Sequence, residues 1–309
     1  MNSYKILVTG GEGFLGKTLQ ASVKKLNNKN QFKFLSRLEI DLLDINQINR
    51  LFRDNDYDCV INLASSRISG ISGEMNTYKT FIENNTINNN IFHASISSGI
   101  KKFINIGSSS IYPPSKNKIK EEEIFTGDPD PGNFFYSLSK LVFTRFLAEI
   151  DKDSDLSYKS LIVPNLFGPH GEKSLDKAHL INSIFTKMYS FKKGLTDSVE
   201  IWGNGEARRE FLYAENLADY LVDYAIDNIA LLPSIMNLGE DQDFTIEEYY
   251  NIVANVLSVK PKFVFLLDKP TGAEKKLMDS SLSKEFNWSP KINTIKGIKT
   301  LYENEKHLY

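Results

Sequence analysis

A tyrosine and a lysine stand four residues apart in the segment Tyr136-Ser137-Leu138-Ser139-Lys140, within a strongly amphipathic stretch. Residues with this spacing lie on one face of a helix. A phenol with its ordinary pKa of about 10 exchanges protons poorly at neutral pH, and a neighbouring ammonium group favours its ionised form. We therefore expect Tyr136 to act as an acid–base group with Lys140 beside it. The competing interpretation is that the two residues are simply neighbours on the exposed face of a helix, because a chain with 14 tyrosines contains this spacing by chance.

A run of serines follows the apolar segment 103–107 and adds a third polar group to this pair. Ser108, Ser109 and Ser110 come directly after Gly107. We expect Ser108 to bind the oxygen of a substrate, close to the tyrosine. The order of the serine run and the Tyr136–Lys140 pair makes the combination more specific than either feature alone.

A glycine-rich turn follows the first apolar run of the chain. Gly10, Gly13 and Gly16 form the spacing G-x-x-G-x-x-G at the entrance to a helical pattern. In such a turn the first glycine permits a tight bend, the second lets the backbone approach a pyrophosphate, and the third allows close packing of helix on strand. The helix N-terminus offers N–H groups to the anion. The alternative is a turn without a ligand, but the position between strand and helix favours a dinucleotide site.

The end of the second predicted strand distinguishes two dinucleotides. A carboxylate there accepts a hydrogen bond from the ribose 2′-hydroxyl of NAD, whereas an arginine accommodates the 2′-phosphate of NADP. The sequence has Leu35-Ser36-Arg37, without an acid at the expected place. NADP is therefore favoured, with Arg37 and Ser36 at the phosphate; alternatively, Arg37 is an ordinary solvated side chain. The other residues expected near the cofactor are Asp41, Leu42, Leu63, Ala64 and Ser65.

The elements that must position these residues alternate along the first half of the chain. Short apolar runs separated by helical patterns are typical of a parallel sheet wrapped by crossover helices. We expect strands at 5–9, 32–35, 59–63, 103–107 and 160–163, and helices at 13–26, 45–54, 80–98 and 135–150. The predicted fold class is α/β, a Rossmann-type doubly wound parallel sheet with a smaller C-terminal α/β lobe for the substrate.

The alternation stops after Pro164. The stretch 167–205 contains glycine, proline and lysine and one amphipathic segment at 177–191. A helical pattern at 214–228 and a strand-like run at 235–238 indicate that the chain returns to the first sheet. We predict a dinucleotide-binding domain of residues 1–165 and about 211–238, and a substrate-binding lobe of residues 166–210 and 239–309.

The composition excludes several classes of function. Thirty-seven basic and 39 acidic residues give a net charge of −2, which argues against nucleic acid as a partner. Cys59 is the only cysteine, so we expect neither a disulfide framework nor a metal site built from thiolates. The sequence has no run of about 18 apolar residues and no secretion signal. We expect a cytoplasmic protein that does not bind a membrane.

Further motifs extend over nearly the whole chain. They are Pro164-Asn165-Leu166-Phe167-Gly168-Pro169-His170, Ala178-His179-Leu180, Ile201-Trp202-Gly203-Asn204-Gly205, Arg208-Arg209-Glu210-Phe211-Leu212, and Lys269-Pro270-Thr271-Gly272 followed by Lys276-Leu277-Met278-Asp279. With the glycine turn and the serine, tyrosine and lysine, these motifs make the chain resemble the extended short-chain dehydrogenase/reductases. Within that group it is similar to the GDP-L-fucose synthases, for which the last motif is unusually specific.

The resemblance implies an enzyme that epimerises a GDP-linked 4-keto-6-deoxy sugar at C3 and C5 and reduces C4 with NADPH, in the synthesis of a surface polysaccharide precursor. Tyr136 would donate a proton as hydride reaches C4, assisted by Ser108 and by Lys140, which also holds the nicotinamide ribose. The residues implied in binding the nucleotide-sugar are Ser109, Ser110, Asn165, Lys187, Trp202, Arg209 and Asp279. Those implied in binding NADP, besides the ones named above, are Phe14, Leu15, Pro164 and Leu166.

Two of these implied contacts have simpler alternatives, and so does the implied assembly. Trp202 would stack on a base and Arg209 would pair with a phosphate; instead they could be a core tryptophan and a surface ion pair. Related enzymes form dimers through helices that correspond to residues 80–98 and 135–150, so we expect a homodimer. The apolar faces of these helices could equally cover their own sheet.

The chain departs from the family at one position that matters for the chemistry. The family's epimerase reaction uses a cysteine at the third residue of a Ser-Ser-Cys strand end, where this chain has Ser110, together with a histidine that corresponds to His179. A thiol with an ordinary pKa of about 8.5 can become a base, whereas a hydroxyl needs a strong activating partner. We therefore expect epimerisation to be lost or weakened, while reduction through Tyr136 is retained. His179 would orient the sugar, donate a proton or serve the structure alone.

Two other functions stay open at this point. The first is the full bifunctional 3,5-epimerase-4-reductase, with another residue in place of the thiol. The second is a sensor or scaffold that binds NADP without turnover. The second is disfavoured because a binding protein has no need of the Ser108, Tyr136 and Lys140 combination.

Overall fold

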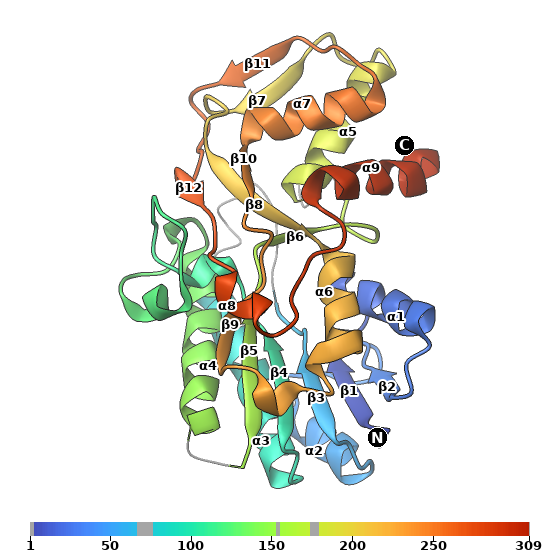
Figure 1. The fold of residues 1–309 in the computed structure, drawn as a ribbon, viewed down its shortest axis with the longest axis vertical. Coiled ribbons are helices and arrows are strands. Elements are labelled where there is room, and N and C mark those ends of the chain that lie inside the picture. The colour runs from blue at the N-terminus through green and yellow to red at the C-terminus, as the bar shows by residue number, and fades with distance from the viewer. Residues whose placement is uncertain (1–2, 67–76, 153–154, 174–178, 309) are drawn as a thin grey trace.

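The computed structural model describes residues 3–66, 77–152, 155–173 and 179–308. Two lobes lie one above the other along the long axis of the molecule (Figure 1). The strands are β1 (Lys5–Thr9), β2 (Gln31–Phe34), β3 (Cys59–Asn62), β4 (Lys102–Ile106), β5 (Ser157–Ile162), β6 (Asn165–Phe167), β7 (Val199–Trp202), β8 (Arg208–Tyr213), β9 (Ile235–Asn237), β10 (Asp243–Thr245), β11 (Phe263–Leu266) and β12 (Lys275–Lys276). The helices are α1 (Phe14–Leu26), α2 (Ile45–Arg53), α3 (Tyr78–Ser97), α4 (Phe134–Lys152), α5 (Leu180–Lys192), α6 (Ala214–Tyr220), α7 (Ile246–Leu257), α8 (Ser281–Lys284) and α9 (Thr294–Glu305).

The larger lobe contains a six-stranded sheet in the order β2-β1-β3-β4-β5-β9, and every neighbouring pair is parallel. Its direction of winding reverses between β1 and β3. In sheets of this kind, ligands bind at the carboxyl ends of the strands beside such a reversal. The predicted Rossmann-type doubly wound sheet is confirmed, and the glycine turn that follows β1 lies at the reversal.

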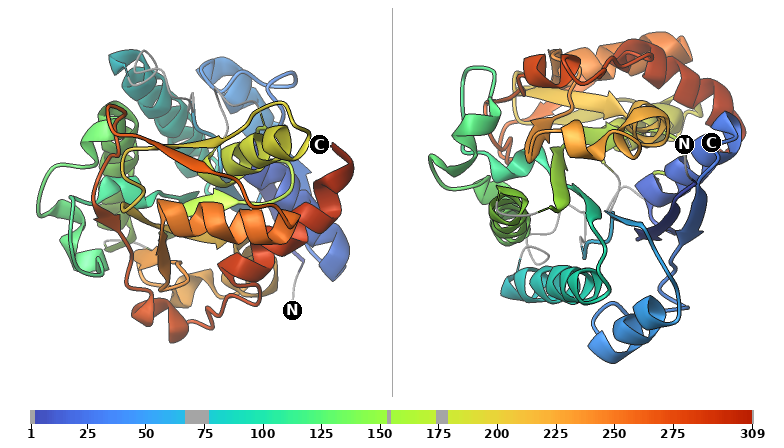
Figure 2. Two further views of the ribbon diagram at one scale, coloured as in Figure 1. Left: turned by 90° about the horizontal axis from the view of Figure 1, so that it is seen from above. Right: turned by 60° about the horizontal axis from the view of Figure 1, so that its bottom comes forward.

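Helices cover both faces of this sheet (Figure 2). Side chains alternate along β1: Ile6 and Val8 pack in one core cluster with α1 and α6, whereas Leu7 packs in another with α2, α3 and α4. Successive residues of a strand point to opposite faces, so a strand buried on both sides is apolar throughout. This is why the inner strands β1 and β3 are short, mainly apolar runs, whereas β2 at the edge of the sheet keeps exposed polar residues.

Strand β5 begins earlier than the apolar pattern predicts. It starts at Ser157 instead of Ser160, and it includes Lys159, whose side chain is buried. The charge of Lys159 is tolerated there because its Nζ lies 2.7 Å from the carboxylate of Asp151, which is equally buried. A lysine read as a strand boundary in the sequence is therefore part of the strand.

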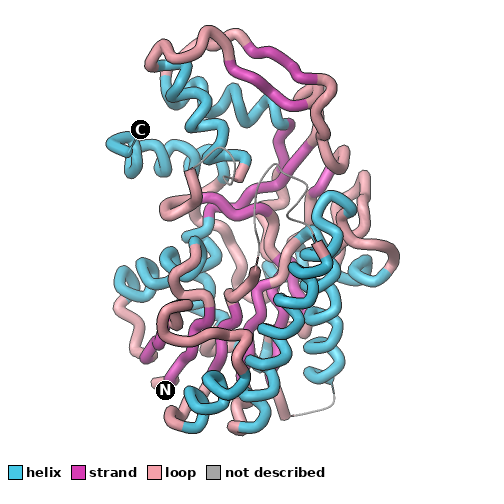
Figure 3. Tube along the Cα trace, turned by 180° about the vertical axis from the view of Figure 1, so that it is seen from behind, coloured by secondary structure: helices cyan, strands magenta, loops and turns pink. Residues whose placement is uncertain are grey.

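The smaller lobe is built around β8. Strands β10 and β12 flank its first residues, and β6 pairs with its last three. Helices α5, α7 and α9 pack against this sheet through a separate core cluster, and β7 and β11 form a two-stranded sheet at the far end (Figure 3). The chain returns to the large sheet at β9, as its strand-like pattern indicates. The predicted domain boundaries at residues 165 and 211 fall within β6 and β8, and the division of the chain into these two domains stays a proposal.

The described part of the chain contains neither a membrane-spanning helix nor a group of metal ligands. None of its helices combines the length and the apolar character needed to cross a bilayer. Within the same residues, no three histidine, cysteine, aspartate or glutamate side chains are grouped so that they could hold a metal ion.

Candidate active site

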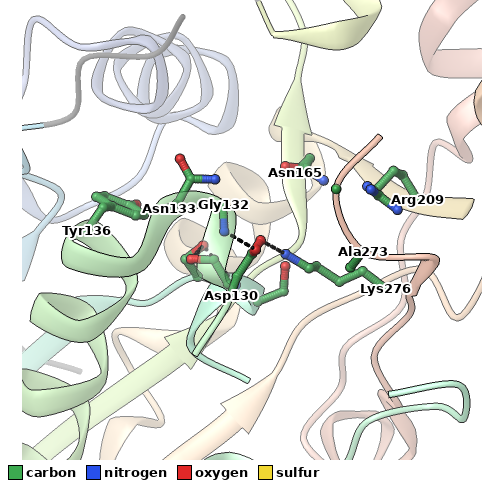
Figure 4. Close-up of a pocket in the computed structure, with 12 residues that line it drawn as sticks. Asp130, Gly132, Asn133, Tyr136, Asn165, Arg209, Ala273 and Lys276 are labelled. Atoms are coloured by element: carbon green, nitrogen blue, oxygen red, sulfur yellow. Dashed lines mark hydrogen bonds and ion pairs between the residues drawn. The ribbon is translucent and has the colours of Figure 1, made fainter. Parts of the chain in front are cut away.

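A cavity lies between the lobes, where the end of β4 and the start of α4 face β6, β8 and β12 (Figure 4). It is lined by Ser108, Ser109, Ser110, Asp130, Gly132, Asn133, Tyr136, Asn165, Arg209, Gly272, Ala273 and Lys276. The cavity thus brings together residues from five separate motifs of the sequence. Among these residues, the serine run lies at the carboxyl end of β4, which is the usual place for a ligand in this fold.

Tyr136 lies in the first turn of α4 and lines the cavity. Lys140 follows one turn later and is only 4% exposed. Its Nζ donates a hydrogen bond of 3.0 Å to the carbonyl of Ile106, the last residue of β4. The lysine is therefore held between α4 and the strand end that leads to Ser108. This geometry agrees with the predicted neighbourhood of Ser108, Tyr136 and Lys140, whose catalytic roles stay a proposal.

The serine run forms a single 3₁₀ turn after β4. The Oγ atoms of Ser108 and Ser110 lie 2.9 Å apart, and the backbone N–H of Ser110 donates to Ser108 Oγ at 3.3 Å. The N–H of Ser109 donates to Val163 O at 2.8 Å, which fixes the turn against the end of β5. Ser110, at the position of the family's cysteine, thus has a hydroxyl as its immediate neighbour.

Close approach of main chains explains the glycine turn after β1. Gly10 has φ of +69°, and a Cβ there would lie 2.9 Å from the backbone N of Ala64. A Cβ at Gly16 would lie 2.4 Å from the carbonyl oxygens of Gly10 and Gly11. The first glycine therefore brings the turn against the end of β3, and the last brings α1 against the turn, as predicted.

The N-terminus of α1 is suited to a phosphate. Its N-cap is Gly13, which makes no side-chain capping bond, and the first turn has no acidic residue. Unoccupied N–H groups and the helix dipole favour an anion at such an end. The residues of this turn therefore fit the diphosphate of a dinucleotide, which Gly13 would let approach the backbone.

The turn that follows β2 contains an acid, Glu39, that was not singled out from the sequence. The carboxylate of Glu39 accepts a hydrogen bond from the N–H of Ser36 at 3.0 Å and pairs with Lys33. The bond from Lys33, followed by that from Ser36, lowers the pKa of Glu39. Arg37 is exposed on the same turn. Glu39 was missed because it stands beyond the strand end and reaches back through a turn.

The remaining residues predicted near the cofactor differ in their surroundings. Asp41 is exposed, and its carboxylate accepts a bond of 3.0 Å from the N–H of Leu43. Leu42 packs against the core beneath α2 and α3. Ser65 Oγ donates to Asn84 at 3.1 Å. Those that are partly or fully buried are Phe14, Leu15, Leu63, Ala64, Pro164 and Leu166. Contact of this group with a cofactor stays a prediction.

Asn165 and Arg209 are the predicted substrate residues on the second-lobe side of the cavity. Asn165 Nδ2 donates to Glu210 O at 3.4 Å. The guanidinium of Arg209 donates to the carbonyls of Arg208 and Thr271, at 2.7 and 2.9 Å. Burial lowers the pKa of Arg209 although the nearby Asp130 carboxylate opposes this. The cavity therefore has a partly desolvated cation opposite Tyr136, suited to an anionic ligand.

Four other predicted residues do not line this cavity. Lys187 donates to Glu200 O at 2.9 Å and to the Tyr250 hydroxyl at 3.2 Å inside the smaller lobe. The Trp202 ring lies 5.9 Å from Lys269 Nζ, at the end of β7. Asp279 accepts bonds from Ser281 at the start of α8, and His179 is the N-cap of α5. Their contact with a substrate stays a prediction.

Asp130 and Asn133 line the cavity and were not singled out from the sequence, and Lys276, which also lines it, was included in a family motif without an assigned role. The carboxylate of Asp130 pairs with Lys276 Nζ across the gap between the lobes (Figure 4). Burial alone would raise the pKa of Asp130, but the attraction and hydrogen bond of Lys276, together with the Gly132 N–H and the charge of Arg209, outweigh it and lower that pKa. The two residues are 146 positions apart, so no local pattern could connect them.

Comparison with known proteins places the chain in a family. Residues 6–239 match the model of the NAD dependent epimerase/dehydratase family. The chain is 35% identical over 297 residues to GDP-L-colitose synthase of Yersinia pseudotuberculosis, covering 95% of each chain. It is 31% identical over 301 residues to GDP-L-fucose synthase of Azorhizobium caulinodans, covering 97% of this chain and 95% of that protein. A GDP-mannoheptose C4 reductase of Campylobacter jejuni, solved with NADP bound, superposes with a TM-score of 0.87 at 25% identity and 99% coverage of both chains.

The parallel sheet, the glycine turn and the Ser108, Tyr136 and Lys140 arrangement define an extended short-chain dehydrogenase/reductase. More narrowly, the chain belongs to the NAD dependent epimerase/dehydratase family, and its relatives include the GDP-L-fucose synthases named above. The resemblance inferred from the sequence is thereby confirmed.

Proposed function

We propose that this protein uses NADPH to reduce the C4 keto group of a GDP-linked 4-keto-6-deoxy sugar. The observation that carries the proposal is one cavity that holds Ser108 and Tyr136 on one side and Arg209 on the other. The names of the relatives support the class of substrate, because they refer to GDP-linked sugars. The solved Campylobacter jejuni protein contains NADP.

The reaction needs a hydride at the carbonyl carbon and a proton at its oxygen, which NADPH and this chain supply respectively. Bound on the glycine turn, NADPH supplies the hydride. Ser108 and Tyr136 donate hydrogen bonds to the carbonyl oxygen, and Tyr136 transfers its proton as negative charge develops there. The fixed ammonium of Lys140 stabilises the phenolate that remains. The products are an alcohol at C4 and NADP⁺.

We expect the guanine nucleotide to be recognised over other bases. Purified protein with NADPH should be stabilised against heat by GDP more than by CDP, UDP or dTDP, because a ligand that binds the folded state raises its stability. The same protein should oxidise NADPH when a GDP-linked 4-keto-6-deoxy sugar is added. Equal stabilisation by all four nucleotides would contradict the recognition of guanine. If no nucleotide-linked keto sugar led to NADPH oxidation, the proposed reductase activity would be wrong.

Epimerisation at C3 and C5 is expected to be lost or weakened. In the described part of the chain the hydroxyl of Ser110 has the Ser108 hydroxyl as its partner, which is not the strong base that a hydroxyl nucleophile or base requires. Among the described residues that line the cavity, the carboxylate is Asp130, whose charge is paired with Lys276. These observations favour a reductase over the bifunctional epimerase-reductase, which is the alternative.

The protein is also proposed to form a homodimer through α3 and α4. These neighbouring helices expose Ile82, Val142 and Phe146 to 55, 45 and 39%. Apolar side chains exposed on adjacent helices are typical of a subunit interface.

Light scattering should give twice the chain mass of 35.1 kDa, and Val142→Asp should give a monomer. Leu267→Asp, at an exposed site of the smaller lobe, should stay dimeric; a monomeric wild type would contradict the interface.

A further inference from the structure

Asp130 contacts three separate elements around the cavity. Its N–H donates to Ser110 O at 3.0 Å, in the turn after β4. One carboxylate oxygen accepts from the N–H of Gly132 at 2.9 Å, in the turn that leads into α4 and Tyr136. The other oxygen pairs with Lys276 on β12 of the smaller lobe (Figure 4). A single residue thus connects three elements: its backbone N–H bonds to the serine turn, and its carboxylate joins the turn before Tyr136 to the opposite lobe.

The ion pair is well protected from solvent. The side chains of Asp130 and Lys276 are 13 and 14% exposed, and Arg209 adds a second positive charge on the same side of Asp130. A pair in such surroundings is weakly screened by salt, and removing one partner leaves an uncompensated charge in a partly buried place. Its loss should therefore disturb the local structure more than the loss of a surface pair would.

Lys276 is fixed to the residues that face Tyr136. It lies opposite Arg209 in the parallel pairing of β12 with β8. The segment before β12 presents Gly272 and Ala273 to the cavity, and Thr271 O accepts from the Arg209 guanidinium. A shift of Lys276 would therefore move the whole second-lobe side of the cavity relative to Tyr136.

We propose that Asp130 is a positioning residue, which holds the second-lobe side of the cavity in register with Ser108 and Tyr136 through its ion pair with Lys276. This inference rests on the proposed reduction and deepens it, because the sugar must present its keto carbon to a fixed hydride donor. A displacement of about 1 Å can cost on the order of 100-fold in rate. The glycine turn contacts neither residue, so cofactor binding is independent of the pair.

The test compares kcat, KM and the Kd for NADPH in the full-length protein. Asp130→Asn keeps an oxygen for the N–H of Gly132 but removes the charge, and Lys276→Met removes the partner. We expect each to lower kcat for the keto sugar by about 10- to 100-fold, with Kd for NADPH unchanged. Because both break one interaction, the double variant should be no slower than the singles. Lys276→Arg, which keeps the charge, should recover most of kcat.

Lys284→Met is the matched control, since it removes a lysine from an exposed pair with Asp241, and it should keep wild-type kcat. If the wild type is active and both Asp130→Asn and Lys276→Met keep its kcat, the positioning role is wrong while the proposed reduction stands. Losses that simply multiply in the double variant would also overturn the positioning role. A wild type that reduces no nucleotide-linked keto sugar would overturn the proposed function and this role with it. If Asp130→Asn does not fold, Lys276→Met and Lys276→Arg decide the matter.

Discussion

Tyr136→Phe should reduce the keto sugar about 100 to 10,000 times more slowly than the wild type, the range typical for loss of a general acid. The change removes one oxygen from a side chain that lines the cavity and leaves Ser108 and Lys140 in place. The proton that the developing alkoxide needs would then have to come from solvent. Steady-state rates of NADPH oxidation at saturating keto sugar measure the effect.

Tyr78→Phe makes the same chemical change at a tyrosine that is 59% exposed on α3, and it should keep the wild-type rate. The Kd for NADPH should be unchanged in both variants, because neither tyrosine belongs to the glycine turn of residues 10–16. A Tyr136→Phe enzyme as fast as the wild type would show that the phenol is not the proton donor. That outcome would also remove the main reason to prefer an enzyme over an NADP-binding scaffold.

Ser110→Cys should introduce proton exchange at C3 or C5 of the keto sugar. Without NADPH in deuterated water, the wild type should leave both carbons unlabelled, since its hydroxyl at this position is a poor base. A thiol with an ordinary pKa of about 8.5 is partly ionised near neutral pH. Mass spectrometry and NMR of the recovered sugar should therefore detect deuterium with the variant alone.

Ser98→Cys provides the control for a thiol elsewhere, because Ser98 is exposed at the end of α3, and it should give no labelling. NADPH oxidation by Ser110→Cys should persist, since Tyr136 and Lys140 are untouched. Deuterium at C3 or C5 with the wild type would favour the bifunctional epimerase-reductase. An unlabelled sugar with Ser110→Cys would mean that more than the thiol separates this site from an epimerase.

The residues that follow from local chemistry were predictable from the sequence. The inner strands β1 and β3 are buried on both faces, so each is a short, mainly apolar run that stands out from the helices around it. Gly10 and Gly16 were recognisable because main chains approach where their side chains would be. Tyr136 and Lys140 were recognisable because helical spacing alone puts them on one face.

The opposite side of the cavity could be only partly predicted. Asn165 and Arg209 were included through the family motifs, and both line the cavity. Asp130 was not included, and the ion pair of Asp130 with Lys276 was not predictable, because it depends on how β12 pairs with β8 and on how the lobes meet. Lys187 was included as a substrate residue through the family resemblance, yet it bonds to Glu200 O and Tyr250 within its own lobe. Sequence periodicity gives the face of a helix but not the partner of that face.

The most direct test of the account follows the hydride itself. The wild type would be incubated with a GDP-linked 4-keto-6-deoxy sugar and NADPH that carries deuterium at the transferable position of its nicotinamide ring. We predict one deuterium in the product, bonded to C4, and none there when Tyr136→Phe is given the same time. Oxidation of NADPH with no deuterium at C4, or with deuterium at another carbon, would contradict reduction of the C4 keto group.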